Sequence, residues 1–201
     1  MIPGLWDMHT HNWWQIHFSN QYIANGVLGV RNMYTPMSMI APLKDSIRKG
    51  LMKGPYYVAA GRVLEGAHPE FPDWLVIDSV NKIKPALDTL ALEGSDFVKV
   101  YSKIPREVYF ELMKEVKRRE LRAEGHLPMA VTALEASNAG QRSFEHLLGI
   151  PDLCADHELF RQLRSVDAAQ SGWSTRATES PIASEASTQL ALRGRATEAK
   201  A

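Results

Sequence analysis

Pro-Gly-Leu-Trp-Asp-Met-His-Thr-His (residues 3–11) is a short apolar run that ends in two histidines one residue apart. Residues i and i+2 of a β-strand point to the same face, so His9 and His11 can aim two imidazole rings at one point. A divalent metal ion needs its protein ligands arranged in this way. Because an ordinary polar strand end gives the same pattern, the stretch is informative only together with the rest of the chain.

Composition limits the classes of protein to consider. The 201 residues allow one domain or slightly more. The 23 lysines and arginines balance the 23 aspartates and glutamates, so no nucleic-acid or membrane partner is expected. Cys154 is the single cysteine, which excludes a disulfide framework and fits a reducing, cytoplasmic location. No signal peptide or membrane span is expected, because no basic segment precedes an apolar stretch and no apolar run is long enough.

Strand and helix patterns alternate through six rounds after this start. Gly61 to Trp74 is expected to be a long loop of the kind that often binds ligands. The alternation predicts an α/β fold, with a parallel sheet or barrel covered by helices. Strands are predicted between the Pro3-Gly4 turn and His11, between the glycine stop at Gly26 and Met33, and at 56–61, 96–101, 121–126 and 142–147. Helices are predicted at 15–25, 39–49, 79–93, 105–121 and 130–139.

The composition changes after Pro151. Residues 156–166 could form one amphipathic helix, with Leu159, Phe160, Leu163 and Val166 on its apolar face. Residues 171–201 are rich in Ala, Ser, Thr and Arg and contain no β-branched run, so disorder or a marginal helix is expected there.

Five polar residues stand at predicted strand ends: His9, His11, Lys99, His126 and His146. In a parallel barrel the carboxyl ends of all strands open on one face, where active sites are built. Lys99 is unusual because it interrupts the apolar run Phe-Val-Lys-Val-Tyr (97–101), so its amine must be neutral, paired or modified. Taken alone, Lys99 is better explained as a strand lysine with a buried stem whose amine reaches water, but four histidines placed at matching strand ends favour a functional site.

These residues resemble the metal-dependent amidohydrolase superfamily, in the branch of imidazolonepropionase-like enzymes and Xaa-Pro dipeptidases. The resemblance covers roughly residues 1–155. It is carried by residues 3–11, by Asn-Gly-Val-Leu-Gly-Val-Arg-Asn-Met (25–33), Asp-Phe-Val-Lys-Val-Tyr (96–101), Gly-His-Leu-Pro (125–128) and Ala-Gly-Gln-Arg-Ser-Phe-Glu-His-Leu (139–147).

The resemblance implies a TIM-like (β/α) barrel with two zinc ions. By it, His9 and His11 bind the more buried ion, a carbamylated Lys99 bridges the ions, and His126 and His146 bind the second. It further implies hydrolysis of C–N bonds in cyclic amides or small peptides, with a water between the ions as nucleophile. Tyr101 is a candidate for contact with substrate or with the tetrahedral intermediate, although a rim aromatic is an equal alternative. Trp13, Trp14 and the 61–74 loop are candidates for lining the pocket, with plain packing as the alternative for each, whereas His17, His68 and His157 match no metal position.

The chain departs from the family pattern at both ends. It starts at the Pro-Gly-Leu motif, and strands seven and eight are not recognisable, so the strand-eight aspartate that takes a proton from the water has no candidate. Neither Asp152, Asp156 nor Asp167 lies in a predicted strand. We therefore expect an incomplete barrel of about six βα units over 1–155 and a non-family tail over 156–201. An open barrel exposes strand edges and favours a homo-oligomer. The alternative to a hydrolase is an inactive, truncated barrel remnant.

Overall fold

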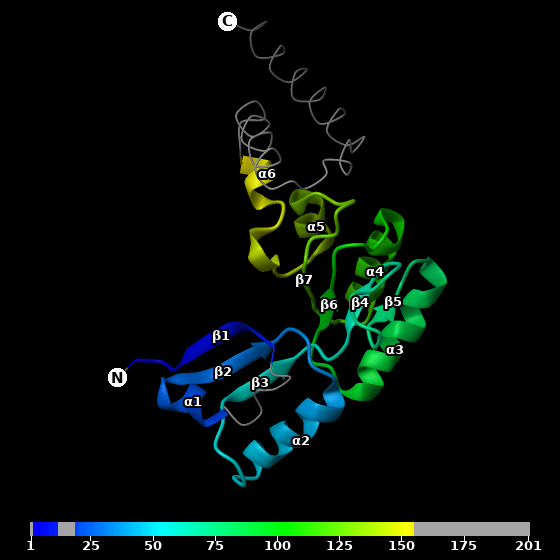
Figure 1. Cartoon of the computed structure of the whole chain (residues 1–201). Coiled ribbons are helices and arrows are strands. Elements are labelled where there is room, and N and C mark those ends of the chain that lie inside the picture. Colours follow the sequence, from blue (N-terminus) through cyan, green and yellow to red (C-terminus); the bar gives the residue numbers. More distant parts are fainter. Residues whose placement is uncertain (1, 12–18, 155–201) are drawn as a thin grey trace, which may run out of the picture. The chain divides into compact units, whose positions relative to one another are not determined.

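The computed structural model describes residues 2–11 and 19–154 (Figure 1). The described residues up to Leu153 belong to one compact unit. Several predictions lie outside the described residues: the first four residues of the 15–25 helix, the 156–166 helix, the tail after it, Trp13, Trp14, His17 and His157.

Short strands alternate with helices along the described chain (Figure 1). Among the described helices, none has the length and apolar character needed to cross a bilayer. The strands are β1 (Leu5–Thr10), β2 (Val27–Asn32), β3 (Tyr56–Ala59), β4 (Val63–Glu65), β5 (Leu75–Val76), β6 (Val98–Val100) and β7 (Ala123–Gly125). The α-helices are α1 (Ser19–Ala24), α2 (Met37–Arg48), α3 (Ile83–Glu93), α4 (Arg106–Arg118), α5 (Ala133–Ala139) and α6 (Ile150–Cys154), and the 3-10 helices are η2 (Val80–Lys82) and η3 (Glu145–Leu147).

The described strands form two parallel sheets, in the orders β1-β2-β3 and β5-β4-β6-β7. The α/β fold with parallel strands is therefore confirmed, whereas a single closed barrel sheet is not seen. The two sheets meet in sequence at residues 60–62, where Gly61 takes a left-handed φ of 70°. Since β3 pairs with β2 and β4 pairs with β6, the chain passes from one sheet to the other through the turn at Gly61.

One loop prediction and one strand prediction need correction. The 61–74 segment is not a loop throughout, because it contains β4. The three residues of β4 are all buried, but three residues are too few to show a strand pattern in the sequence. The predicted sixth strand, 142–147, is reduced to one bridge between Gly125 and Phe144, followed by η3. The φ angles of His146 and Leu147 are 60° and 56°, which are incompatible with extended strand backbone.

The helices cover the sheets along their predicted apolar faces. The 105–121 segment carries an apolar stripe of Val108, Leu112, Met113 and Val116 at helical spacing, and in α4 these side chains are all buried. They join α3 and strands β6 and β7 in one core cluster. Helix α2 packs Met37, Ile40 and Leu43 against residues of β2 and β3. Pro85 lies in the first turn of α3, where its missing N–H costs no hydrogen bond. Helix α5 begins later than predicted, at Ala133, because Thr132 and Glu135 form a capping box before it.

Candidate metal centre

Lys99 is the central residue of β6 and is 2% exposed. Its backbone pairs with Val63 of β4 on one side and with Glu124 of β7 on the other, so the lysine sits in the middle of the sheet. Burial lowers the pKa of Lys99 to about 8, because an ammonium group loses hydration inside the protein. A sizeable neutral fraction of the amine is therefore present near neutral pH, which any reaction of this amine with an electrophile requires.

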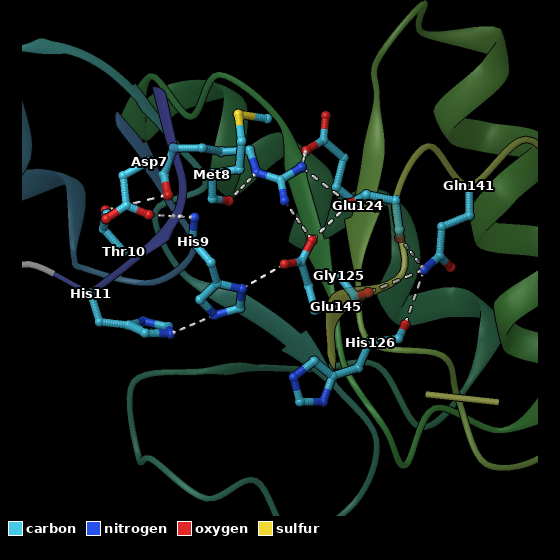
Figure 2. Close-up of polar contacts among 12 residues, drawn as sticks. Asp7, Met8, His9, Thr10, His11, Glu124, Gly125, His126, Gln141 and Glu145 are labelled. Carbon is cyan, nitrogen blue, oxygen red and sulfur yellow. Dashed lines mark hydrogen bonds and ion pairs between the residues drawn. The ribbon is translucent and has the colours of Figure 1, made fainter. Parts of the chain in front are cut away.

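His9 and His11 come from the end of β1 and point to the same side, as predicted (Figure 2). Their Nε2 atoms are 3.0 Å apart. The Nδ1 atom of His9 contacts Glu145 Oε2 at 2.5 Å, and Nδ1 of His11 lies 3.4 Å from the carbonyl oxygen of Tyr34. Burial is the main cause that lowers the pKa of His11, so its ring stays neutral and keeps a free lone pair at neutral pH.

His126 and His146 approach the same place from the carboxyl-terminal side of β7 and from η3. The ring of His146 is 4.7 Å from that of His9 and 5.2 Å from that of His126, measured between centroids. Burial, with Lys99 and the other histidines, lowers the pKa of His126 to about 3 and also lowers that of His146. The left-handed backbone at His146 is uncommon for a residue with a side chain, and such strain clusters at functional sites.

The five predicted residues line one pocket of about 430 Å³. The rest of its lining comes mainly from aromatic residues of the 61–74 segment and the strand ends. Trp74 contacts Tyr34, Phe71 and Tyr101, with ring centroids 4.6–5.5 Å apart. The 61–74 segment was a candidate for lining the pocket, and it contributes Val63, Glu70, Phe71 and Trp74 to the lining.

Tyr101 follows β6 and stacks on His126, with the ring centroids 4.0 Å apart and the planes 24° from parallel. Its hydroxyl donates to Glu70 Oε2 at 3.2 Å. Burial and the carboxylates of Glu70 and Glu65 raise the pKa of Tyr101 to about 12. Tyr101 is therefore a phenol at neutral pH and can donate a hydrogen bond into the pocket. His68, which matches no metal position, is exposed and does not line the pocket.

The donor chemistry of this pocket suits a divalent ion. Two ring nitrogens bound to one ion at roughly 2.0–2.1 Å and at a tetrahedral angle lie about 3.3 Å apart, close to the 3.0 Å between His9 and His11. Within the described ranges, no group of three or more His, Cys, Asp or Glu side chains is arranged around one point to hold an ion. Lysine is not one of those residue types, and Lys99 would offer oxygen ligands only after carbamylation. The residues therefore fit a metal ion chemically, with the His9–His11 pair already at a suitable spacing.

A buried ionic network beside the histidines has no counterpart in the sequence predictions. Arg31 donates to Glu124 Oε2 and to Glu145 Oε1, both at 2.6 Å, and to the carbonyl oxygen of Met8 at 2.7 Å. Arg31 is 9% exposed, and the two glutamates are each 6% exposed. The available signal was the one that singled out Lys99, namely a charged residue inside an apolar strand run, here Val-Leu-Gly-Val-Arg (27–31).

Comparison with known proteins gives matches by structure. The sequence matches no protein-family model and no curated protein. A bottromycin amidohydrolase is 23% identical with a TM-score of 0.64, over 73% of this chain and 33% of that chain. A Xaa-Pro dipeptidase with methionine bound in its active site is 19% identical with a TM-score of 0.56, over 72% and 48%. An ochratoxinase from A. niger is 17% identical with a TM-score of 0.55, over 81% and 50%.

The chain thus spans a third to a half of the length of these proteins. All three are amidohydrolase-superfamily members, as the sequence motifs led us to expect. The described part of this chain therefore has the fold of the amidohydrolase superfamily.

Proposed function

We propose that this chain carries the metal-binding part of an amidohydrolase that cleaves C–N bonds in small amides or dipeptides. The observation that carries the proposal is the convergence of His9, His11, Lys99, His126 and His146 on one pocket. They come from segments up to 137 residues apart (146 − 9). None of these four histidines is fully buried, and a purely structural role would not require all four to face a buried lysine.

The proposed ligand set is divided between two zinc ions. His9 and His11 would hold the first ion and His126 and His146 the second, with carbamylated Lys99 between them. In carbamylation, the neutral amine of Lys99 would add to the carbon of carbon dioxide, forming an N–C bond as one C=O π bond opens and its electron pair moves to oxygen. One proton would leave the nitrogen for water, which gives a carbamate anion. The lowered pKa of Lys99 supports this step, because only the unprotonated amine has a free electron pair. The bound ions would polarise a substrate carbonyl and lower the pKa of a water.

The remaining pocket residues have roles of their own in this proposal. The aromatic wall formed by Tyr34, Phe71, Trp74 and Tyr101 would hold the apolar part of a small amide and exclude water from it. The Tyr101 hydroxyl would turn its single hydrogen from Glu70 to the oxygen of the amide as negative charge develops on that oxygen. The strand-eight aspartate of the family has no counterpart among the described residues that line the pocket, so the proton acceptor is not assigned.

The fold proposal follows from the same comparison. We assign six strands of a (β/α) barrel to β1, β2, β3 with β4, β6, β7 and the bridge at Phe144, in which β3 and β4 are the two halves of the third strand. The partial barrel would end near residue 155. The substrates named for the structural relatives, such as Xaa-Pro dipeptides, are the first candidates for this chain.

The test is metal content measured on the purified chain. Loading with zinc at pH 8 in bicarbonate should give up to two ions per chain, and His126→Ala and His146→Ala should each reduce that number. His68→Ala is the matched control, because His68 lies outside the pocket. Zinc at background level in the unsubstituted chain would refute the proposal. Zinc binding without turnover of amides or Xaa-Pro dipeptides would favour the inactive remnant instead.

A further inference from the structure

Glu145 holds the ring of His9 from the side opposite the pocket. Its Oε2 atom lies 2.5 Å from Nδ1 of His9, while Nε2 of the same ring faces His11 (Figure 2). An ionised carboxylate can only accept hydrogen bonds, so the hydrogen in this contact belongs to Nδ1. In the tautomer whose single N–H is at Nδ1, Nε2 of His9 has its lone pair free on the pocket side.

The other oxygen of Glu145 is also occupied. Oε1 accepts from Arg31 Nη2 at 2.6 Å and from Ser143 Oγ at 2.8 Å. With both oxygens engaged, the carboxylate cannot turn about its terminal bond without losing charged hydrogen bonds. Because arginine and the serine hydroxyl donate here, an oxygen atom is required at this position.

Arg31 is in turn held by three separate segments. It donates to the Met8 carbonyl oxygen in β1, to Glu124 in β7 and to Glu145 in η3. The guanidinium group is planar and rigid, so these contacts fix one relative position of the segments that carry the histidines. His9 follows Met8 directly, and His146 follows Glu145.

We propose that Glu145 is a positioning residue, which fixes His9 in the tautomer that presents Nε2 to a metal ion, and that Arg31 fixes Glu145. This inference rests on the proposed metal site but goes beyond its ligand set. Carboxylates that accept from the second nitrogen of a ligand histidine raise metal affinity, and their loss commonly costs 10–100-fold. Glu145 does not line the pocket itself and would act through His9, which does.

Glu145→Gln gives a sharp test because only one orientation of the amide satisfies Arg31. The amide oxygen must replace Oε1 facing Arg31 and Ser143, which turns the NH2 group toward Nδ1 of His9. Nδ1 must then accept, the ring hydrogen moves to Nε2, and the lone pair is lost from the pocket. We expect the affinity for zinc, measured by competition with a chelator, to fall by about 10–100-fold.

Glu124→Gln is the matched control. Glu124 shares Arg31 and is equally buried, but its side chain accepts from Arg31, whereas that of Glu145 also accepts from His9. Its zinc affinity should stay within about 3-fold of the original, whereas both variants should lose similar stability. Equal losses of affinity in the two variants would show a general structural role and overturn the proposal.

A second readout needs neither metal nor activity. Histidine nitrogen NMR of the metal-free chain should show the Nδ1–H form for His9, and the Nε2–H form in Glu145→Gln. An Nε2–H form in the unsubstituted chain would overturn the proposal even if the variant did not fold. Absence of zinc binding by the unsubstituted chain would instead refute the proposed function, so the two failures are distinguishable.

Discussion

Replacing Arg31 with methionine should strongly destabilise the metal-free chain. Methionine keeps the length of the side chain but removes the charge and all its donors, leaving Glu124 and Glu145 buried without their cation. The side chains in these pairs are only 7–11% exposed. Removing one partner of a buried ion pair costs about 3–5 kcal/mol, because the remaining charge has neither water nor a counterion. That is a large part of the roughly 5–15 kcal/mol that stabilises a typical domain.

The assay is urea unfolding followed by circular dichroism, in the presence of EDTA. With a slope of about 2 kcal/mol per molar urea, a loss of 3–5 kcal/mol lowers the midpoint by about 1.5–2.5 M. Arg62→Met is the matched control, since Arg62 pairs with Glu93 where the side chains are 27% and 30% exposed. Such a pair contributes about 1 kcal/mol or less. If Arg31→Met lost no more stability than Arg62→Met, burial of the two glutamates without their counterion would carry no extra cost. That result would refute the predicted loss of about 3–5 kcal/mol.

Two further predictions concern parts of the fold outside the pocket. The hydrogen bond from Arg106, with those from Thr132, lowers the pKa of Glu135 to about 2, so its contribution to stability is present above about pH 4.5 and is lost as the pH falls toward 2. Glu135→Ala should cost about 1 kcal/mol near neutral pH, and thermal melts should show this difference closing over that window; a difference independent of pH would contradict it. In Gly66→Ala the new Cβ would lie 1.9 Å from the carbonyl oxygen of Lys103, so we expect a loss of about 1–3 kcal/mol or more. Gly94→Ala meets no atom within 4 Å and has only its left-handed φ to oppose it, so equal urea midpoints for the two variants would refute the steric argument.

The sequence was informative about this site where a charged residue interrupts an otherwise apolar strand. Lys99 interrupts an apolar strand, and the structure buries it as that pattern predicted. The histidines were predicted to converge because they stand at the ends of predicted strands. The carboxyl ends of parallel strands open on one face. The parallel α/β class and the apolar stripe of α4 were predictable for the same reason, because periodicity reports which face of an element is buried.

The missed features depend on contacts between distant segments. Arg31 lies 93 residues from Glu124 and 114 from Glu145. The residues around a glutamate in the sequence do not indicate which distant arginine it will pair with. The strand β4 was missed because three residues cannot show a period. The sixth strand was predicted at Arg-Ser-Phe-Glu-His-Leu (142–147), but the left-handed backbone of His146 and Leu147 prevents an extended strand there.

The ionic network bears on function through its energetics. A buried arginine with two buried glutamates is an inefficient way to gain stability, since apolar residues of similar volume often stabilise as well or better. Apolar packing does not orient hydrogen-bonding groups. Arg31 holds the carboxylate of Glu145 in one orientation, and Glu145 in turn determines which nitrogen of His9 faces the pocket. The network lies directly behind the histidine pair whose nitrogens are already 3.0 Å apart. This placement favours a role in the geometry of the site over a role in holding the two sheets together.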